Sequence, residues 1–485
     1  MLTSSRINII HGNSLHATSI HILDDDSLLN IFHLYRPSLL GEDQNVDTRI
    51  NGGGEWAGEH WWYRLAHICQ RWRNLILRSA SYLGLCLVCT YGTPVADMLA
   101  NSPPLPLAID YRDKDITAEE EEAIILALAQ RDRVRRLRLV IPVLKLQKLI
   151  VAIDGEYPIL EYLILWVPPE ERTDVLVLPE TLQTPHLRHL AIDCSIPIRF
   201  PLLTTAVGLT TLCLSLYHPS TYFEPAALLQ SLSLMYQLET LLIFFHFVVP
   251  NREVERQLMR APITTHVTLL NLRLFAFQAL SVYSEAVLSR ITAPRLEILQ
   301  IGYKQLTFSI PELVQFIRRT ENFKFARAKF EFLSGRVYVS VNPNETNMVE
   351  DALSIIVDCW HLNWQVSSVA QIFNALSQIF VTVEHLTLVH GVHIQSSEEH
   401  NEVADRTEWR KLLRSFNNVK TLRIKDGLVG ELSRCLPSED GEHPLEVLPE
   451  LRELTFSGSG NANDAFNSFI DARQNAGRPV TLIKS

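Results

Sequence analysis

The chain has 485 residues, of which 47% are hydrophobic and 20% are charged, so its apolar content is ample for a continuous folded core. Its formal net charge is −10, which argues against a general nucleic-acid or anionic-membrane partner, because either would require a basic face. The longest apolar run, residues 241–249, is about half of what a membrane-spanning helix requires, and the amino terminus has no secretory signal pattern.

Two segments near the amino terminus have helical periodicity. Residues 23–35 begin with Asp24 as a suitable N-cap, and the two aspartates after it complement the positive end of the helix dipole. The apolar face of this segment contains Leu28, Ile31, Phe32 and Tyr35. A polar, glycine-bearing loop or insertion over 37–60 follows, and residues 61–77 predict a second helix. The apolar stripe of that helix contains Trp61, Leu65, Ile68, Cys69, Trp72, Leu75 and Ile76.

From about residue 85 the chain becomes repetitive. Residues 83–89 and 105–110 have the composition of strands, and Thr117 with Glu120 forms a capping box ahead of a helix that runs to about Arg131. A short apolar cassette, Leu-x-x-Leu-x-Leu or a close variant, then returns along the chain. It starts at Val134, Leu160, Leu187, Leu209, Leu238, Leu269, Leu296, Val383, Val419 and Leu451.

The regular spacing of this cassette indicates a repeat architecture. Between Val134 and Leu296, successive starts lie 22 to 31 residues apart, and a period of this length is typical of a stacked array. A strand and a helix in each repeat, stacked in parallel, predict an α/β fold. We expect a curved leucine-rich-repeat solenoid, a ribonuclease-inhibitor-like horseshoe with strands inside and helices outside. The helices are expected around 144–153, 225–236, 251–260, 281–290, 311–319 and 367–378.

Two places interrupt the rhythm. Residues 325–341 alternate with period two around Ser334-Gly335-Arg336, which predicts a β-hairpin. This hairpin and the apolar segment 354–360 are expected to fill an irregular repeat. Residues 396–405 are acidic and predict a surface loop.

The amino-terminal segments resemble the F-box domain. The resemblance is carried by Leu23, the acids at 24–26, the apolar residues at 28–32, and LAHICQRWRNLIL from Leu65. Together with the later cassettes, the chain resembles F-box and leucine-rich-repeat proteins of higher fungi. The resemblance implies docking on a Skp-type adaptor and, through it, on a cullin-RING ubiquitin ligase. The implied adaptor-binding residues are Leu23, Leu28, Leu29, Ile31, Phe32, Ile68 and Trp72.

Two features depart from the usual F-box pattern. Asp24 stands where a proline is usual, and an insertion separates the two helices where a short loop is usual. The alternative interpretation is a helical cap that protects the first repeat of the array. The expected organisation is a tail over 1–17, an F-box-like domain over 18–84 with its insertion at 37–60, and a solenoid over 85–485 with the hairpin repeat near 325–360.

No motif predicts catalysis, a metal site or a cofactor. Cys86 and Cys89 form a lone CxxC on an apolar strand, where buried thiols are the favoured interpretation. His385, His390 and His393 are close in sequence, but strand alternation separates them. Seven cysteines on apolar segments fit a reducing compartment, so a cytoplasmic or nuclear location is expected.

The predicted functional surface comes from the residues between the cassette leucines. These alternate with core positions and should line the open face of the sheet. Lys329, Arg423 and Lys425 are expected on the same face. Aromatic residues and arginines on such a face suit a protein interface. The predicted client-binding residues are Tyr162, Trp166, Phe244, Asn271, Arg273 and Phe275.

The sequence supports three functions, in order of preference. The first is a substrate-recognition subunit, with the amino-terminal helices on a Skp-type adaptor and the repeat face on a protein client. The second is a leucine-rich-repeat scaffold or inhibitor without a ligase. The third is an enzyme whose site lies in the irregular region after residue 325. Neither a nucleic acid nor a membrane is expected as a partner.

Overall fold

The computed structural model describes most of the chain. The described residues are 22–36, 61–112, 116–168, 176–194, 200–218, 224–246, 263–304, 309–320, 323, 325–343, 351–391, 402–425, 427–437, 445–457 and 465–484. They form two compact units, the first ending at Val88 and the second beginning at Cys89. The expectations for the tail 1–17, the insertion 37–60 and the helix 251–260 lie outside the described residues. The acidic loop is described only from Glu402, where a helix begins.

The first unit consists of short helices around an aromatic core. They are α1 (Asp25–Tyr35), α3 (Trp61–Ala66), α4 (Gln70–Arg78) and α5 (Ala80–Leu83). The Asp24 carboxylate accepts a hydrogen bond from the Ser27 backbone N–H at 2.7 Å, so the residue that replaces the usual proline caps α1. The Phe32 and Trp72 rings pack edge to face, with centroids 4.8 Å apart.

The single helix predicted over 61–77 is wrong, because the chain breaks at 67–69. Cys69 has extended backbone angles and becomes the N-cap of α4, its sulfur accepting from the Trp72 backbone N–H at 3.5 Å. The Arg73 guanidinium closes the break by donating to the Ala66 carbonyl at 3.1 Å. Because of the break, Trp62 enters the core, while Ile68 stays exposed.

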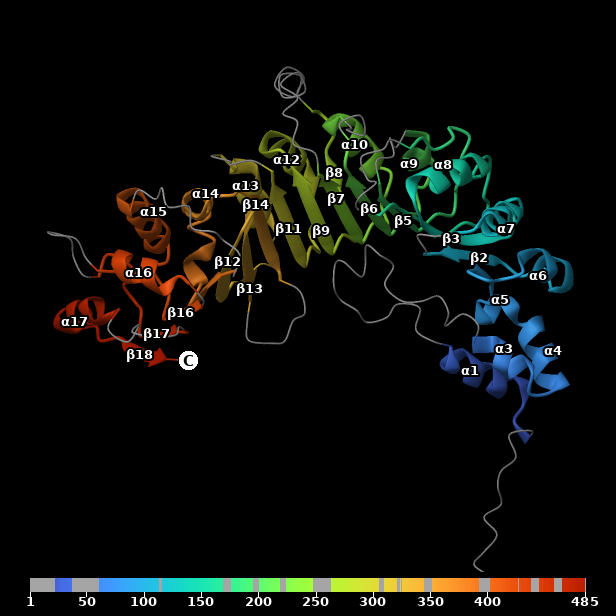
Figure 1. Ribbon diagram of the computed structural model, residues 1–485, viewed down its shortest axis with the longest axis horizontal. Helices are drawn as coiled ribbons and strands as arrows, with labels where there is room; N and C mark the ends of the chain where they lie inside the picture. The colour runs from blue at the N-terminus through green and yellow to red at the C-terminus, as the bar shows by residue number, and fades with distance from the viewer. Residues whose placement is uncertain are drawn as a thin grey trace, which may run out of the picture. The chain divides into compact units, whose positions relative to one another are not determined.

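The second unit is built on an open, mostly parallel sheet of sixteen strands, which confirms the predicted α/β class (Figure 1). All described pairs from β2 onward are parallel, except the two that β13 makes with β14 and β12. A separate pair joins β8 (Val267–Thr268) to β10 (Ile291–Thr292). The strands, in the order of the sheet, are β1 (Leu87–Thr90), β2 (Leu107–Tyr111), β3 (Val134–Val140), β4 (Tyr162–Trp166), β5 (His189–Asp193), β6 (Thr211–Leu216), β7 (Thr240–Phe245), β9 (Leu274–Ala279), β11 (Ile298–Tyr303), β14 (Leu353–Asp358), β13 (Arg336–Asn342), β12 (Arg327–Leu333), β15 (His385–His390), β16 (Thr421–Lys425), β17 (Glu453–Phe456) and β18 (Thr481–Lys484).

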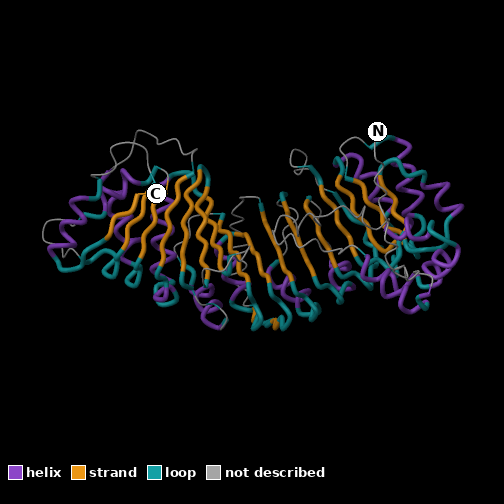
Figure 2. The backbone as a smooth tube through the Cα atoms, turned by 90° about the horizontal axis from the view of Figure 1, so that it is seen from below, coloured by secondary structure: helices purple, strands orange, loops and turns teal. Residues whose placement is uncertain are grey.

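Helices alternate with these strands along the chain, and Figure 2 shows them gathered on one side of the row of strands. The Glu285 carboxylate on one helix accepts from the backbone N–H groups of Glu312 and Leu313 at the start of the next, which fixes neighbouring helices together. The helices are α6 (Val95–Asn101), α7 (Ala118–Leu128), α8 (Val143–Ala152), α9 (Phe200–Thr205), α10 (Pro225–Leu232), α12 (Ser281–Leu288), α13 (Pro311–Arg319), α14 (Leu362–Ala375), α15 (Glu402–Arg414), α16 (Val429–Cys435) and α17 (Asn467–Asn475).

The cassette leucines form the core beneath the helices. The fourth and sixth cassette positions are register partners from strand to strand, as Leu163 and Leu190 are, or Leu165 and Ile192. These side chains have no exposed surface. Because side chains alternate along a strand, the residues between them point to the other face of the sheet.

The repeat that contains β9 has a different register from the predicted one. The sequence predicts a cassette from Leu269, but Leu241 is the register partner of Phe275 and Ile243 that of Phe277. The cassette is therefore residues 272–277, with two phenylalanines in the leucine positions. Both cassettes satisfy the apolar spacing, so the pattern alone could not choose between them.

The predicted hairpin is confirmed. Strands β12 and β13 pair antiparallel, with Leu333 opposite Arg336. The next strand in sequence, β14, folds back to pair with β11, so β12 lies beside β15. A charged cluster stabilises this reversal, because the Asp358 carboxylate lies 2.8 Å from Lys304 Nζ and 3.5 Å from Arg336 Nε.

Candidate functional site

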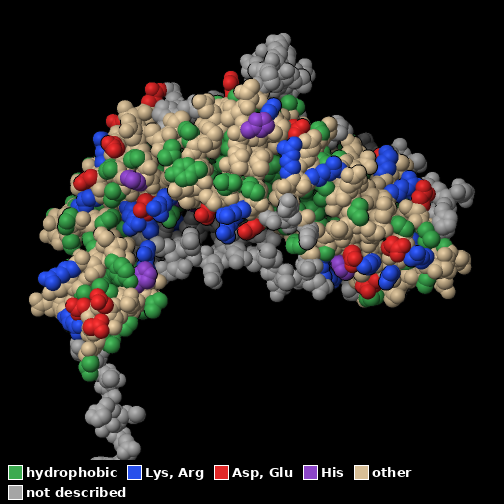
Figure 3. Space-filling view, turned by 180° about the vertical axis from the view of Figure 1, so that it is seen from behind, with side chains coloured by type: hydrophobic (Ala, Val, Ile, Leu, Met, Phe, Trp, Pro, Cys, Tyr) green, Lys and Arg blue, Asp and Glu red, His purple; other side chains and the backbone are tan. Residues whose placement is uncertain are grey.

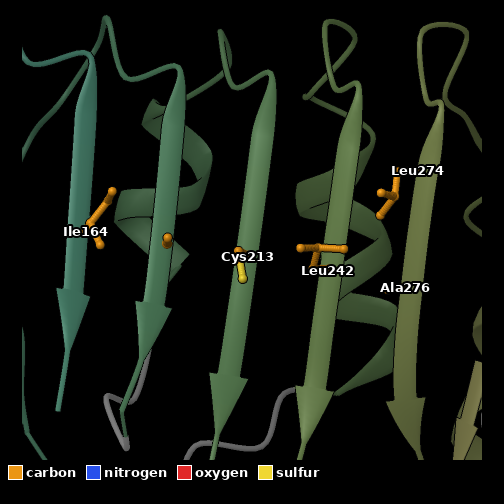
Figure 4. Close-up of a cluster of buried hydrophobic side chains, with 6 residues drawn as sticks. Ile164, Cys213, Leu242, Leu274 and Ala276 are labelled. Carbon is orange, nitrogen blue, oxygen red and sulfur yellow. The ribbon is translucent and has the colours of Figure 1, made fainter. Parts of the chain in front are cut away.

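The candidate site is the face of the sheet that points away from the described helices, here named the strand face. Its middle row passes through register partners on β4, β5, β6, β7 and β9. Figure 4 shows this row with the helices behind the strands. The row consists of Ile164, Ala191, Cys213, Leu242 and Ala276.

This middle row is buried, although it faces away from the helices. None of its side chains is more than 3% exposed, and Phe244 and Ile298 pack against it. A partner would therefore contact the rows on either side of it. The middle row is named here the apolar floor. Side chains of the adjacent rows pack against it, and this packing positions them.

A second row of the strand face lies two residues before the apolar floor on each strand. It begins with three stacked side chains on β3, β4 and β5. The Arg136 guanidinium lies 5.0 Å from the centre of the Tyr162 ring, and that ring lies 5.7 Å from the His189 ring. Burial lowers the pKa of His189 from its usual 6.5 to about 4, so its imidazole is neutral at physiological pH. The stack therefore has one fixed cation, one phenol and one neutral imidazole. Arg136 is buried, so only the partly exposed Tyr162 and His189 rings can contact planar or apolar groups, and nothing in the stack suggests proton transfer.

Three of the six predicted client-binding residues lie on the strand face. Tyr162 and Trp166 on β4 and Phe244 on β7 are partly exposed there. Asn271 lies in the turn before β9, where its side-chain amide donates to the Tyr236 carbonyl at 3.2 Å. Its role is to stabilise that turn.

The other two predicted residues belong to the same repeat. Arg273 also lies in the turn before β9, with its guanidinium exposed and 3.8 Å from Glu297. Phe275 is in the core, fully buried, with its ring centroid 6.1 Å from that of Phe316. The shift in register removes Phe275 from the strand face, so it cannot bind a client, contrary to the prediction.

Farther along, the strand face becomes basic. Lys329 on β12, Thr387 on β15 and Arg423 on β16 are successive register partners. Lys425 follows two residues after Arg423 and so points the same way. Between β4 and β9, by contrast, no lysine or arginine of the described strands lies on this face. The strand face thus has an aromatic section and a basic section.

The structure divides the predicted adaptor-binding residues into two groups. Leu28, Phe32 and Trp72 are buried inside the first unit, so they hold its helices together and are not available to a partner, contrary to the prediction. Leu23 and Leu29 are partly exposed, while Ile31 and Ile68 are 41% and 56% exposed. The sequence-based prediction missed Leu34, an exposed residue that the spacing from Ile31 could have indicated.

Buried ion pairs and thiols have structural roles. Asp110 on β2 accepts a hydrogen bond from Arg138 on β3 at 2.7 Å, and both side chains are buried. Cys86 and Cys89 are buried thiols rather than a disulfide, and burial raises the pKa of Cys89 to about 12. His385 Nδ1 lies 2.7 Å from the Thr421 hydroxyl.

Other features of the described chain offer little chemistry. Among the described residues, no group of three His, Cys, Asp or Glu side chains could hold a metal ion. A groove of about 600 Å³ lies between α14 and α15 and is lined by amides, hydroxyls and the Glu408–Lys411 pair. On the molecular face drawn in Figure 3, acidic and basic side chains are interspersed, so that face offers no broad basic surface. None of the described helices has the length and hydropathy needed to cross a membrane.

Comparison with known proteins does not assign the chain to a family. No protein-family model matches it, and no curated protein matches it either. Its function must therefore be argued from its own surfaces.

Proposed function

We propose that the chain is the substrate-recognition subunit of an SCF-type cullin-RING ubiquitin ligase. In this proposal the first unit is an F-box-like domain that docks a Skp-type adaptor. The second unit is a leucine-rich-repeat solenoid whose strand face binds a protein client. The chain contributes positioning of the client, and the ligase supplies the chemistry.

One observation carries the proposal: α1 exposes large apolar side chains in addition to those that it buries. Ile31, Leu34 and Tyr35 are 41%, 83% and 57% exposed. They recur at i, i+3 and i+4 and therefore share one face of the helix. Contiguous apolar side chains on a small helical unit are typical of a protein interface.

The buried and exposed faces of α1 have separate roles in this proposal. Leu28 and Phe32 attach α1 to α4 from within. Arg71 attaches its amino-terminal end, donating to the Leu23 carbonyl and to the Asp25 carboxylate, both at 2.7 Å. The remaining apolar face is thereby held rigidly toward solvent, which lowers the entropic cost of docking.

The second unit supports the other half of the proposal. Its cassettes keep one register over most of the sheet, as repeats of a stacked array do. On its strand face, Trp166 and Phe244 are partly exposed beside a buried apolar floor. Aromatic side chains in such settings are frequent hot spots of protein binding.

Binding of the full-length chain to a purified Skp-type adaptor tests the proposal. Ile31→Asp with Leu34→Asp places two charges on the exposed face of α1 and should weaken adaptor binding at least tenfold. The control is Ile125→Asp with Leu126→Asp on α7, where both apolar side chains are also exposed, at 43% and 39%. The control should bind the adaptor as the unaltered chain does.

The possible outcomes separate the candidate functions. Unchanged adaptor binding by the folded α1 variant would contradict the docking surface. If the unaltered chain binds no adaptor but still captures a client, the scaffold function gains over the ligase function.

A further inference from the structure

We propose that the basic section of the strand face binds an extended, carboxylate-rich segment of a protein partner. Lys329, Arg423 and Lys425 carry this proposal and are named here the basic cluster. The proposal rests on the proposed function, because the segment would belong to the client that the second unit captures.

The register of the sheet places the three cations. Lys329 and Arg423 lie two strands apart in one row, with Thr387 between them. Strands are spaced about 4.8 Å apart, so their Cα atoms are about 10 Å apart. Arg423 and Lys425 alternate with buried Leu422 and Ile424 on one strand, which places them about 7 Å apart on the same face.

The charges of the basic cluster are open to a ligand. Within the described part of the chain, neither Arg423 nor Lys425 has an ion-pair partner. Lys329 Nζ lies 2.7 Å from the Glu331 carboxylate, but the two side chains are 49% and 35% exposed. An exposed pair of this kind contributes at most about 1 kcal/mol, so a competing carboxylate can replace Glu331.

The local charge opposes that of the whole chain. On the strand face, β12 and β16 carry four cations, which are Arg327 and the three residues of the basic cluster. The carboxylates there are Glu331 on β12 and Glu453 on β17. The chain as a whole has a net charge of −10. A local excess of cations on an acidic protein attracts acidic partners selectively and raises their association rate.

The spacing favours a run of carboxylates over a single phosphate. A phosphate site needs several donors that converge on one point, whereas the basic cluster is spread over roughly 10 Å. In an extended peptide, side chains on one face recur about every 7 Å, which matches the separation of Arg423 and Lys425. The geometry therefore suits acidic residues at alternate positions.

The two sections of the strand face also set a distance within the client. Five strand-to-strand steps lead from Phe244 on β7 to Lys329 on β12. They span roughly 24 Å, which about seven extended residues can bridge. A client that uses both sections should therefore have an apolar anchor and an acidic run separated by roughly that many residues.

Fluorescence anisotropy with the full-length chain tests the basic cluster. The probes are two fluorescein-labelled peptides, (Glu-Ser)6 and its uncharged counterpart (Gln-Ser)6. At low salt the Glu peptide should bind at least tenfold more tightly than the Gln peptide, and added salt should weaken its binding. Arg423→Glu with Lys425→Glu should weaken binding of the Glu peptide at least tenfold.

A charge-matched control separates the basic cluster from net charge. Arg318→Glu with Arg319→Glu makes the same change on α13, where both side chains are exposed. This control should bind the Glu peptide within about threefold of the unaltered chain. Equal losses in both variants, or equal binding of the Glu and Gln peptides, would overturn the proposal.

Two further arms give decisive outcomes. If a (Gln-Ser)6 peptide with a single phosphoserine binds tenfold more tightly than (Glu-Ser)6, the site is a phosphate site and the carboxylate assignment is wrong. Adaptor binding of the Arg423→Glu, Lys425→Glu variant is measured in parallel and should be unchanged. Peptide binding requires no adaptor, so failure of this proposal and failure of the ligase proposal are separate results.

Discussion

The register of β9 leads to a strong prediction about stability. Phe275 is fully buried, and its ring centroid lies 5.9 Å from that of Phe277 and 6.1 Å from that of Phe316. Phe275→Ala should therefore lower the free energy of unfolding by about 3–5 kcal/mol. Arg273→Ala, two residues earlier, should change it by less than about 0.5 kcal/mol, because that guanidinium is 64% exposed and its carboxylate partner is similarly exposed.

Urea denaturation of the full-length variants, followed by circular dichroism, measures the difference. Because a chain with a sixteen-stranded sheet need not unfold in one step, hydrogen exchange of β9 and α13 should be measured as well. Phe275→Ala should increase exchange in both elements, and the coupling with Phe316→Ala should be about 0.5–1.5 kcal/mol. A larger loss from Arg273→Ala than from Phe275→Ala would refute the register and restore the cassette at Leu269.

Two further predictions concern buried polar groups. The pKa of His189 is lowered to about 4, so the stability contributed by its neutral form is present above pH 6.5 and is lost as the pH falls toward 4. His189→Gln should reduce the change in the free energy of unfolding between pH 7 and pH 4 by at most about 3 kcal/mol, as measured by urea titrations at each pH. Arg473 is fully buried and donates to the carbonyls of Leu448, Pro449 and Leu451 at 3.0–3.2 Å. Arg473→Lys should therefore lower the free energy of local unfolding around α17 by about 2–4 kcal/mol, measured as faster hydrogen exchange in that helix. Unchanged exchange would show that lysine satisfies the same carbonyls.

Much of the second unit could be predicted from the sequence, because leucine or another apolar residue marks both buried positions of the cassette strands. The alternation of strands and helices and the hairpin around Gly335 follow from period and turn chemistry. The register at Leu269 could not be chosen, since apolar residues satisfy two overlapping cassettes. The break before α4 was also missed, because Cys69 is a weak capping residue and neither glycine nor proline stands nearby.

The sequence could not predict which side chains of the strand face are buried, and the reason is a different one. Alternation tells which face a side chain takes but not how closely its neighbours cover it. Leu242 and Arg138 both occupy positions predicted to be open, and both are buried, one in the apolar floor and the other in an ion pair with Asp110. In the first unit, helical periodicity placed Ile31 and Phe32 on one face, but the packing of α4 covers only Phe32.

The basic cluster shows how topology can assemble chemistry that no sequence window contains. Arg423 and Lys425 are visible as neighbours on one predicted strand, but Lys329 lies far away in sequence. If the strands followed chain order, β13 and β14 would both separate β12 from β15, and the strand that carries Asp358 would pair with β15. The reversal places β14 against β11 instead, where Lys304 and Arg336 neutralise Asp358. The reversal thus both removes the strand of Asp358 from the basic section and brings Lys329 within two strands of Arg423.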